Sequence, residues 1–275
     1  AITRLLGKNK YKIHVIANKK NSLAGSSKYC VKEIVKTNPG VDDYKKIIRK
    51  FNIDVVLPIG FNSTKLFSQH KKEFEKITKV PVVDFDKFTV AGDKTKTAKF
   101  AEKFKIQAPQ TTIIKSEKDM KKINIFPVVI KASEESGSVD YAHNKEELKK
   151  KIKATQKKYG HHQSKPIVQE YIPGLNGYGF YALYWNGKII SYYMHQRLHM
   201  FPRSGGRSSY AQTFNDKKLF LAGKNVLDRL HWHGVAMVEF KQHEKTTEYY
   251  LIEINPKYWG STDLGIQAGY KLPIH

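Results

Sequence analysis

The sequence predicts a protein of the α/β class whose C-terminal part is α+β. In residues 1–86, helix-like stretches alternate with short apolar stretches, which is typical of a parallel α/β lobe. After Gly174 the pattern changes, because two apolar segments flank Asn186-Gly187, a strong signal for a two-residue hairpin turn. We therefore expect a parallel α/β lobe that is followed by an antiparallel sheet.

The individual elements follow from apolar periodicity and turn residues. Residues 1–10 read as a helix already under way, although such lobes normally open with a strand, so we expect an N-terminal strand to be missing. The predicted strands are residues 12–17, 54–58, 80–83, 126–132, 167–172, 178–185, 188–197, 235–242 and 249–255. The predicted helices are residues 91–105, 145–159 and 216–230.

Length and composition are those of a folded globular protein. The chain has 275 residues, of which 40% are hydrophobic, and no uncharged apolar run approaches the roughly 20 residues that span a bilayer. Ala1 opens neither a signal peptide nor a transit sequence. The single cysteine, Cys30, excludes a disulfide within the chain and a multi-cysteine metal site. We expect a soluble protein without a membrane partner, located in a reducing cytoplasm.

The formal net charge of +24 means that anionic partners, such as nucleic acid or phosphorylated ligands, must be considered. The lysines are spread over many helical stretches and mixed with glutamates, as on solvated helix faces. Clusters of arginine beside stacking aromatic residues, which are typical of nucleic-acid binders, are not evident in the sequence. The composition therefore disfavours nucleic acid as the main partner.

Two carboxylates and one amide indicate a metal site near the C-terminus. Glu239 ends the apolar run Val235–Val238, where a carboxylate is costly unless it is paired or binds a cation. Alternation places Glu253 and Asn255 on one face of their strand, and hairpin pairing could bring that face beside Glu239. Oxygen donors of this kind suit Mg²⁺ better than zinc. An ordinary hairpin with carboxylates paired to lysines is the alternative.

Two lysines could hold the phosphates of a nucleotide. Lys94 lies at the start of a helix, and Lys131 ends an apolar strand. The small-residue loop that follows Lys131 contains Ser136, Gly137 and Ser138, whose backbone N–H groups could bind phosphate. In a chain this rich in lysine, ordinary solvated lysines are the alternative.

Three arginines stand out in residues 197–207 of a chain dominated by lysine. Arg197, Arg203 and Arg207 surround a proline and a glycine pair, which is the composition of a loop that orders when substrate binds. Their planar guanidinium groups suit a carboxylate or a phosphoryl group. A basic surface loop is the alternative.

Several of these segments resemble the ATP-grasp superfamily in order and spacing. They are Gly92-Asp93-Lys94, residues 126–132, residues 168–174, Val238-Glu239-Phe240 and residues 253–256. The resemblance covers nearly the whole chain, and its most specific stretches are residues 232–240 and 251–261. These stretches are similar to predicted ATP-dependent carboligases related to the carbamoyl-phosphate synthase large subunit.

The resemblance implies a domain division and a role for each motif. It implies a pre-ATP-grasp domain at residues 1–86 and an ATP-grasp domain at residues 87–275, with a lid lobe at about 110–172 and a C-terminal lobe at about 173–275. The implied phosphate contacts are Lys94 and Lys131, and the implied metal ligands are Glu239, Glu253 and Asn255. The implied adenine hinge consists of Gln169, Glu170, Tyr171 and Ile172.

The chain departs from the family pattern at two positions. Lys257 stands where many relatives have arginine, so its phosphate contact would be a point charge and not a bidentate fork. The ribose contact falls near Asn176, where a carboxylate is expected. Relatives also begin before Ala1 and continue past His275, so we expect residues to be missing at both ends.

The function that the resemblance implies is an ATP-dependent ligase. Such an enzyme phosphorylates a substrate carboxylate to an acyl phosphate, which a nucleophile, here expected to be an amine, then captures. The implied cofactors are ATP and Mg²⁺, with Mn²⁺ as an alternative ion. The implied partners are small carboxylates and amines. The resemblance leaves open whether the protein forms an oligomer. Two alternatives remain: an enzyme that phosphorylates bicarbonate or carbamate, and a basic nucleotide-binding module without turnover.

Overall fold

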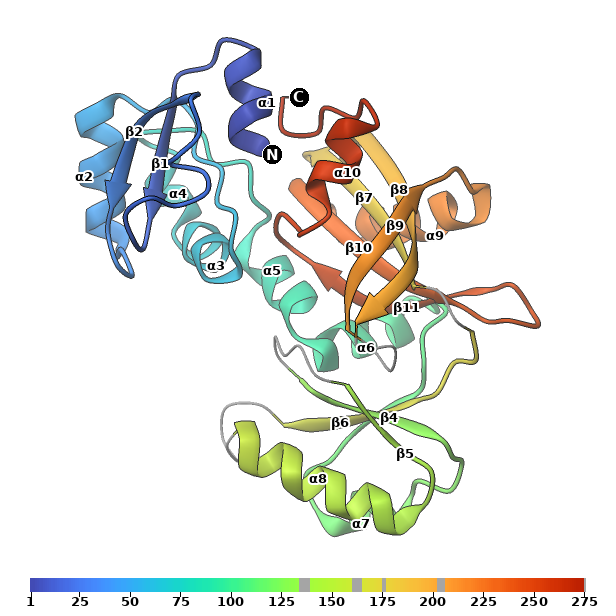
Figure 1. Cartoon of the computed structure of the whole chain (residues 1–275). Helices are drawn as coiled ribbons and strands as arrows, with labels where there is room; N and C mark the ends of the chain where they lie inside the picture. The colour runs from blue at the N-terminus through green and yellow to red at the C-terminus, as the bar shows by residue number, and fades with distance from the viewer. Residues whose placement is uncertain (134–138, 160–164, 175–176, 202–205, 275) are drawn as a thin grey trace.

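The structure is a computed structural model that describes residues 1–133, 139–159, 165–174, 177–201 and 206–274. Figure 1 shows three groups of elements: an N-terminal group around β1 and β2, a five-stranded sheet that ends with the C-terminus, and a smaller lower group around β4, β5 and β6. Helices α5 (Phe85–Gly92) and α6 (Lys94–Lys103) run between these groups. The mixture of parallel and antiparallel pairs confirms the predicted α/β class.

The N-terminal group has a parallel pair of strands covered by helices. α1 (Ile2–Lys8) leads into β1 (Ile13–Ala17), which pairs in parallel with β2 (Cys30–Val35). The remaining helices of this group are α2 (Val41–Phe51), α3 (Phe61–Gln69) and α4 (Lys71–Phe74). Residues such as Tyr44, Phe67 and Phe74 form its apolar core.

Two strand predictions in this group are wrong, and one strand was missed. Residues 54–58 and 80–83 form no regular strand, and a single parallel bridge joins Val55 to Lys79. β2 was not predicted, because its sequence, Cys-Val-Lys-Glu-Ile-Val, does not alternate regularly between apolar and polar residues.

The lower group is a four-stranded antiparallel sheet with two helices on one face. Its strands, in the order β3-β6-β4-β5, are β3 (Thr111–Ile113), β6 (Pro166–Glu170), β4 (Val128–Ala132) and β5 (Asp140–Ala142). α7 (Glu117–Lys121) and α8 (Lys145–Tyr159) lie beside them. Leu148 and Ile152 of α8, one helical turn apart, are buried against the sheet, and this apolar stripe explains why α8 was predictable from sequence.

The five-stranded sheet is antiparallel and has the order β11-β10-β7-β8-β9. Its strands are β7 (Gly177–Trp185), β8 (Lys188–Phe201), β9 (Arg207–Thr213), β10 (Gly234–Gln242) and β11 (Tyr249–Asn255). α9 (Lys217–Arg229) and α5 pack on one face, where Phe180, Trp232 and Val238 belong to the largest apolar cluster. α10 (Thr262–Gln267) follows β11 near the C-terminus.

The prediction of a loop at residues 197–207 is wrong at both of its ends. β8 continues through Arg197 to Phe201, and Arg207 already belongs to β9, which pairs with β8 at the edge of the sheet. Residues 202–205 lie outside the described residues. None of the described helices is both long and apolar enough to cross a membrane.

Candidate active site

The strand register gathers the predicted acidic residues on one face of the five-stranded sheet. Glu239 of β10 lies opposite Glu253 of β11, and Met237 lies opposite Asn255. Because alternate residues of a strand share a face, Glu239, Glu253 and Asn255 all lie on the same face. This is the face opposite the one on which Phe180 and Val238 contribute to the core against α9. The hairpin therefore brings the three predicted ligands together.

Arg197 reaches Glu239 across an intervening strand. β7 lies between β8 and β10, and its residues there are Gly177, opposite Arg197, and Gly179, opposite Glu239. A Cβ atom at Gly177 would lie 3.3 Å from Cδ of Arg197, so glycine leaves the space that this side chain uses. Nη2 of Arg197 donates to Oε2 of Glu239 at 2.6 Å, and the two side chains are 15% and 14% exposed. The pair is a charge-assisted contact inside the protein.

Burial governs the protonation of this pair. Removal from water raises the pKa of Glu239, the Arg197 guanidinium opposes that rise, and the neighbouring Glu253 adds to it. Nε of Arg197 is buried and has no hydrogen-bond partner among the described residues. The free donor and the raised carboxyl pKa indicate a site that is incompletely satisfied without a bound ligand.

Glu253 has different partners from Glu239. Nζ of Lys94 lies 3.5 Å from its Oε2, and Nδ2 of Asn255 donates to its Oε1 at 2.9 Å. Burial alone would raise the pKa of Glu253, but Lys94 and the Asn255 hydrogen bond hold it below its usual range. The two carboxylates face each other across the strand pair, and each is balanced by its own cation.

The lower sheet supplies a further cation at the same place. Lys131 lies near the end of β4, and burial lowers its pKa to about 8. The negative charges of Glu253 and Glu239 oppose this lowering. The backbone N–H of Lys94 donates to the carbonyl of Ser133 at 2.9 Å, which joins the start of α6 to the end of β4. Asp93 caps that helix by accepting from Thr95 N at 2.7 Å. Lys94 and Lys131 therefore converge on the carboxylates from two different elements.

This set of donors fits Mg²⁺. No group of three or more His, Cys, Asp or Glu side chains that could hold a metal occurs in the described residues, which leaves two carboxylates and one amide as the candidate set. The Oδ1 atom of Asn255 keeps acceptor capacity because the contact to Glu253 uses its Nδ2. All three side chains offer hard oxygen atoms of the kind that Mg²⁺ prefers. The alternative from the sequence is a hairpin whose carboxylates pair only with basic side chains. The contacts of Glu239 with Arg197 and of Glu253 with Lys94 also agree with that alternative.

The predicted hinge lies where β6 leaves the lower sheet. The side chain of Gln169 is buried, and its Nε2 donates to Oγ1 of Thr111 at 3.0 Å, while its Oε1 has no partner among the described residues. Glu170 is exposed and its Oε2 accepts from the N–H of Gln110 at 3.2 Å. Ile172 is buried, and Tyr171 lies under Nζ of Lys241, 4.7 Å from the ring centroid.

A profile of the RimK-like ATP-grasp domain matches residues 91–257, which is more than half of the chain. The chain belongs to the RimK-like ATP-grasp family. The matched segment contains Lys94, Lys131, the hinge and the three acidic and amide residues, so the site described above lies inside the family domain.

Known proteins support the same fold. A D-aspartate ligase of Enterococcus faecium is 24% identical over 231 residues, which are 73% of this chain and 52% of that protein. The biotin carboxylase domain of Hydrogenobacter thermophilus 2-oxoglutarate carboxylase, solved with MgADP and bicarbonate, superposes with a TM-score of 0.76 at 14% identity. That match covers 99% of this chain and 64% of the other. An L-amino acid ligase of Bacillus licheniformis gives 0.72 at 14% identity, covering 96% and 66%.

These matches confirm the predicted ATP-grasp fold. The chain spans about half the length of the curated relative that it matches.

Several predicted site residues cannot be placed. Ser136, Gly137, Ser138, Asn176 and Arg203 lie outside the described residues, and so does the side chain of Arg207. Lys257 is described; it is partly exposed and lies just after β11. Their assigned roles stay predictions.

A buried polar network beside Arg197 was missed by the sequence reasoning. The hydroxyl of Tyr181 lies 2.5 Å from Nε2 of His195 and 3.2 Å from Oγ of Ser261. The hydroxyl of Tyr193 donates to the carbonyl of Ser261 at 3.2 Å and accepts from Nε1 of Trp259 at 2.7 Å. These contacts hold the segment after β11 against the sheet. Strand alternation could have indicated this network. His195 lies two residues before Arg197, and Tyr181 lies two residues after Gly179, so each shares a face of the sheet with a residue at the site.

Proposed function

We propose that this chain is an ATP-dependent ligase that activates a carboxylate as an acyl phosphate and transfers the acyl group to an amine. The observation that carries the proposal is the pair of facing carboxylates, Glu239 and Glu253, which lie where the lower sheet, α6 and the five-stranded sheet meet. Buried acidic residues with converging lysines suit a nucleotide whose phosphates bind through a divalent cation. Membership in the ATP-grasp family supports this use of the site.

In this proposal the nucleotide lies between the lower sheet and the five-stranded sheet. The backbone of residues 169–172 offers hydrogen bonds to adenine, and Lys94 and Lys131 offset negative charge on the phosphates. Glu239, Glu253 and Asn255 would hold Mg²⁺, which when bound neutralises phosphate charge and orients the transferred group. In the structure, Glu239 pairs with Arg197 and Glu253 pairs with Lys94. A bound ion would share these two carboxylates with the two basic side chains.

We assign the arginines to the part of the site that binds the substrate carboxylate and its acyl phosphate. Arg197 is held by Glu239 and has a buried Nε with no described partner, so one guanidinium edge is free to bind a carboxylate or phosphoryl oxygen. We assign the same task to Arg207 of β9 and to Arg203, which lies outside the described residues, and a phosphate contact to Lys257. Water exclusion from this site protects an acyl phosphate against hydrolysis.

Amino acids are the substrate class that we expect. Two similar proteins, from Enterococcus faecium and Bacillus licheniformis, are named as ligases of D-aspartate and of L-amino acids. We carry over the class and not the individual acid, because this chain spans about half the length of the first of these proteins. The domain division at residues 86 and 87, the lid lobe at 110–172 and a cytoplasmic location belong to the same proposal.

The proposal is tested by ADP release from Mg·ATP in the presence of a substrate panel. The panel contains amino acids, other carboxylates and bicarbonate, each with and without amines. We expect a carboxylate and an amine together to stimulate release of ADP. Stimulation by bicarbonate alone would instead support the alternative of bicarbonate phosphorylation, and no stimulation with tight nucleotide binding would support a module without turnover.

Replacement of Glu253 by Gln tests the metal assignment. The change removes one charged ligand and leaves Lys94 without its carboxylate, so we expect Mg²⁺-dependent ADP release to fall by about 10²-fold or more. Binding of nucleotide in the absence of Mg²⁺ should persist, because the hinge is untouched. The matched control is Glu248→Gln, whose exposed carboxylate lies 3.6 Å from Lys218 and away from the site. Normal Mg²⁺-dependent turnover in Glu253→Gln would refute the assignment.

A further inference from the structure

The face of the five-stranded sheet that carries Glu239 also carries a buried aromatic side chain, Tyr181. Tyr181 follows Gly179 of β7 by two residues, so both lie on this face. Its side chain is fully buried, and its ring centroid lies 4.5 Å from that of Tyr193 and 4.5 Å from that of Trp259. Packing between two aromatic rings leaves this phenol little freedom to move.

The glycine at position 179 lets the phenol lie toward the carboxylates. A Cβ atom at Gly179 would lie 2.7 Å from Oη of Tyr181, so the phenol lies back along β7 over this glycine. In the sheet, Gly179 lies between Glu239 of β10 and His195 of β8. The side chain of Arg197 crosses the same strand two residues further along to reach Glu239. The phenol and the Arg197 side chain therefore lie side by side over β7.

The charges of the site act on this phenol. Burial raises the pKa of the Tyr181 hydroxyl well above its usual value, and the positive charge of Arg197 opposes that rise. The negative charge of Glu239 adds to it. The hydroxyl is therefore uncharged at neutral pH and lies within the field of the Arg197–Glu239 pair.

The side chains of Tyr181, His195 and Ser261 form a closed ring of hydrogen bonds. Oη of Tyr181 lies 2.5 Å from Nε2 of His195 and 3.2 Å from Oγ of Ser261, which in turn lies 3.4 Å from Nδ1 of the histidine. Burial lowers the pKa of His195 to about 3, so its ring carries one proton at neutral pH. With that proton on Nδ1, Tyr181 donates to Nε2, Nδ1 donates to Ser261, and Ser261 donates to Tyr181. Every polar hydrogen of the three side chains then has an acceptor inside the ring.

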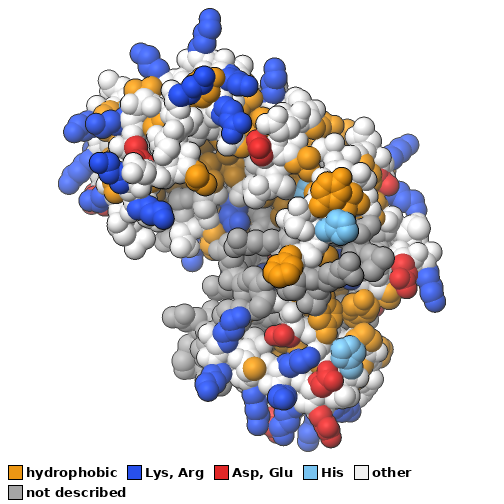
Figure 2. Space-filling model, in the orientation of Figure 1, with side chains coloured by type: hydrophobic (Ala, Val, Ile, Leu, Met, Phe, Trp, Pro, Cys, Tyr) orange, Lys and Arg blue, Asp and Glu red, His pale blue; other side chains and the backbone are white. Residues whose placement is uncertain are grey.

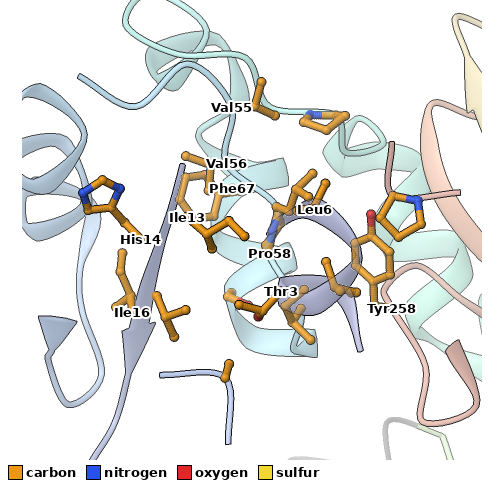
Figure 3. A pocket seen from close by; sticks show the side chains of 18 of the residues that line it. Thr3, Leu6, Ile13, His14, Ile16, Val55, Val56, Pro58, Phe67 and Tyr258 are labelled. Atoms are coloured by element: carbon orange, nitrogen blue, oxygen red, sulfur yellow. The ribbon is translucent and has the colours of Figure 1, made fainter. Parts of the chain in front are cut away.

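Ser261 belongs to a segment that β7 and β8 hold against the sheet. The hydroxyl of Tyr193 donates to the carbonyl of Ser261 and accepts from Nε1 of Trp259. Residues 258–260 also line a cavity of about 1770 Å³, and Figure 3 shows Tyr258 across this cavity from β1. The segment thus lies between the cavity and the sheet, and its hydrogen bonds to the sheet determine where Ser261 lies.

We infer that Tyr181 is a positioning residue for Arg197 and that His195 and Ser261 hold its hydroxyl in place. Nη2 of Arg197 donates to Glu239, while its buried Nε has no partner among the described residues. Packing against neighbours such as Tyr181 therefore decides where the guanidinium group lies. A group that is already held in place loses less freedom when it binds a substrate. This role rests on the proposed function only in the assignment of Arg197 to the substrate carboxylate and its acyl phosphate.

The variant Tyr181→Phe tests this role, because it removes the hydroxyl and keeps the ring. We expect the Nε–H group of Arg197, observed by ¹⁵N NMR, to exchange with water about tenfold faster than in the parent chain. The matched control is Tyr184→Phe, which removes another buried hydroxyl of β7. That hydroxyl donates to Asp228 at 2.9 Å on the opposite face of the sheet. In the control, the Arg197 group should exchange at the rate of the parent.

Ser261→Ala opens the same ring of hydrogen bonds without changing a residue of the sheet. It should speed exchange of the Arg197 Nε–H group in the same direction by a smaller factor, and it replaces Tyr181→Phe if that protein does not fold. If the ring only holds the segment after β11, both variants will speed exchange of the Thr262 amide, which donates to the carbonyl of Trp259 at 3.2 Å, and leave Arg197 unchanged.

Turnover gives a second measurement. In ADP release stimulated by carboxylate and amine, Tyr181→Phe should lower kcat by about tenfold and leave the KM for ATP within about twofold, because the hinge is untouched. In an Arg197→Lys background, the same change should have little further effect, since both changes act through one side chain. Two effects that multiply would show that Tyr181 acts independently of Arg197, against the inference.

The exchange rates also separate this role from the proposed ligase. Unchanged Arg197 exchange in both Tyr181→Phe and Ser261→Ala would overturn the role, as would equal acceleration in Tyr184→Phe or rapid exchange already in the parent. The NMR comparison needs no turnover. A parent chain that releases no ADP with any carboxylate and amine would therefore overturn the ligase, while the exchange rates still decide the role of Tyr181.

Discussion

At the residue scale, a glycine leaves room for the contact between Arg197 and Glu239. A Cβ atom at Gly177 of β7 would lie 3.3 Å from Cδ of Arg197, whose side chain crosses β7 to reach Glu239. The sequence could predict that Glu239, Glu253 and Asn255 share a face, since strand alternation and a hairpin suffice for that. It could not predict the Arg197 contact, which depends on β8 and β10 flanking the same strand. The predicted strand ended at Arg197 and the predicted loop began there, whereas β8 continues to Phe201.

His195 provides a residue-scale prediction about pH. Its side chain is 1% exposed, and burial, assisted by the nearby Arg197, lowers its pKa to about 3. The unfolded chain binds a proton at this residue below its ordinary pKa of about 6.5, whereas the folded chain does so only near 3. Stability from this residue is therefore present above pH 6.5 and is lost as pH falls toward 3, by at most about 1.4 kcal/mol per pH unit.

Urea unfolding as a function of pH measures this effect. The variant His195→Gln cannot take up the proton, so its unfolding free energy should depend less steeply on pH in that window. Identical pH slopes for the parent and His195→Gln would show that the buried ring does not stay neutral.

At the element scale, the elements with a clear apolar stripe or alternation were predictable, and elements without one were not. α8 and β11 have the bounds that the sequence predicts, because each buries one regular face. β9 has the polar sequence Arg-Ser-Ser-Tyr-Ala-Gln-Thr and forms through its ladder to β8 at the edge of the sheet. Residues 54–58 contain the apolar run Val55–Leu57 that predicted a strand, but only one bridge forms there, between Val55 and Lys79.

The packing of α9 on the sheet gives an element-scale prediction. A Cβ atom at Gly223 would lie 2.3 Å from ring atoms of Phe180, a fully buried residue of β7. Gly223→Ala should therefore destabilise the protein by about 1–3 kcal/mol in urea unfolding, despite the gain of about 1 kcal/mol in helix propensity. Gly260→Ala is the control, because no heavy atom lies within 4 Å of that Cβ position. A Gly223→Ala protein as stable as the parent would mean that α9 packs less closely than described.

At the scale of the whole molecule, the lower sheet, the five-stranded sheet and helix α6 between them contribute to one site. The lower sheet brings Lys131, the helix between the groups brings Lys94, and the five-stranded sheet brings the carboxylates and Arg197. Figure 2 shows basic side chains spread over the N-terminal group and mixed with acidic ones on the lower group. That distribution agrees with solvated helix faces as the origin of the +24 charge, whereas Lys94, which we assign to the proposed site, is only 12% exposed.

The most direct test of the proposed ligase follows the oxygen of the carboxylate. Carboxylic substrates labelled with ¹⁸O are supplied with amine and Mg·ATP, and the released phosphate is analysed by mass spectrometry. The carboxylate oxygen that attacks the γ-phosphate bridges carbon and phosphorus in the acyl phosphate and leaves with the phosphate when the amine attacks the carbon. We therefore predict ADP together with phosphate that carries one ¹⁸O atom. Phosphate that takes its oxygen only from water, or release of AMP in place of ADP, would contradict it.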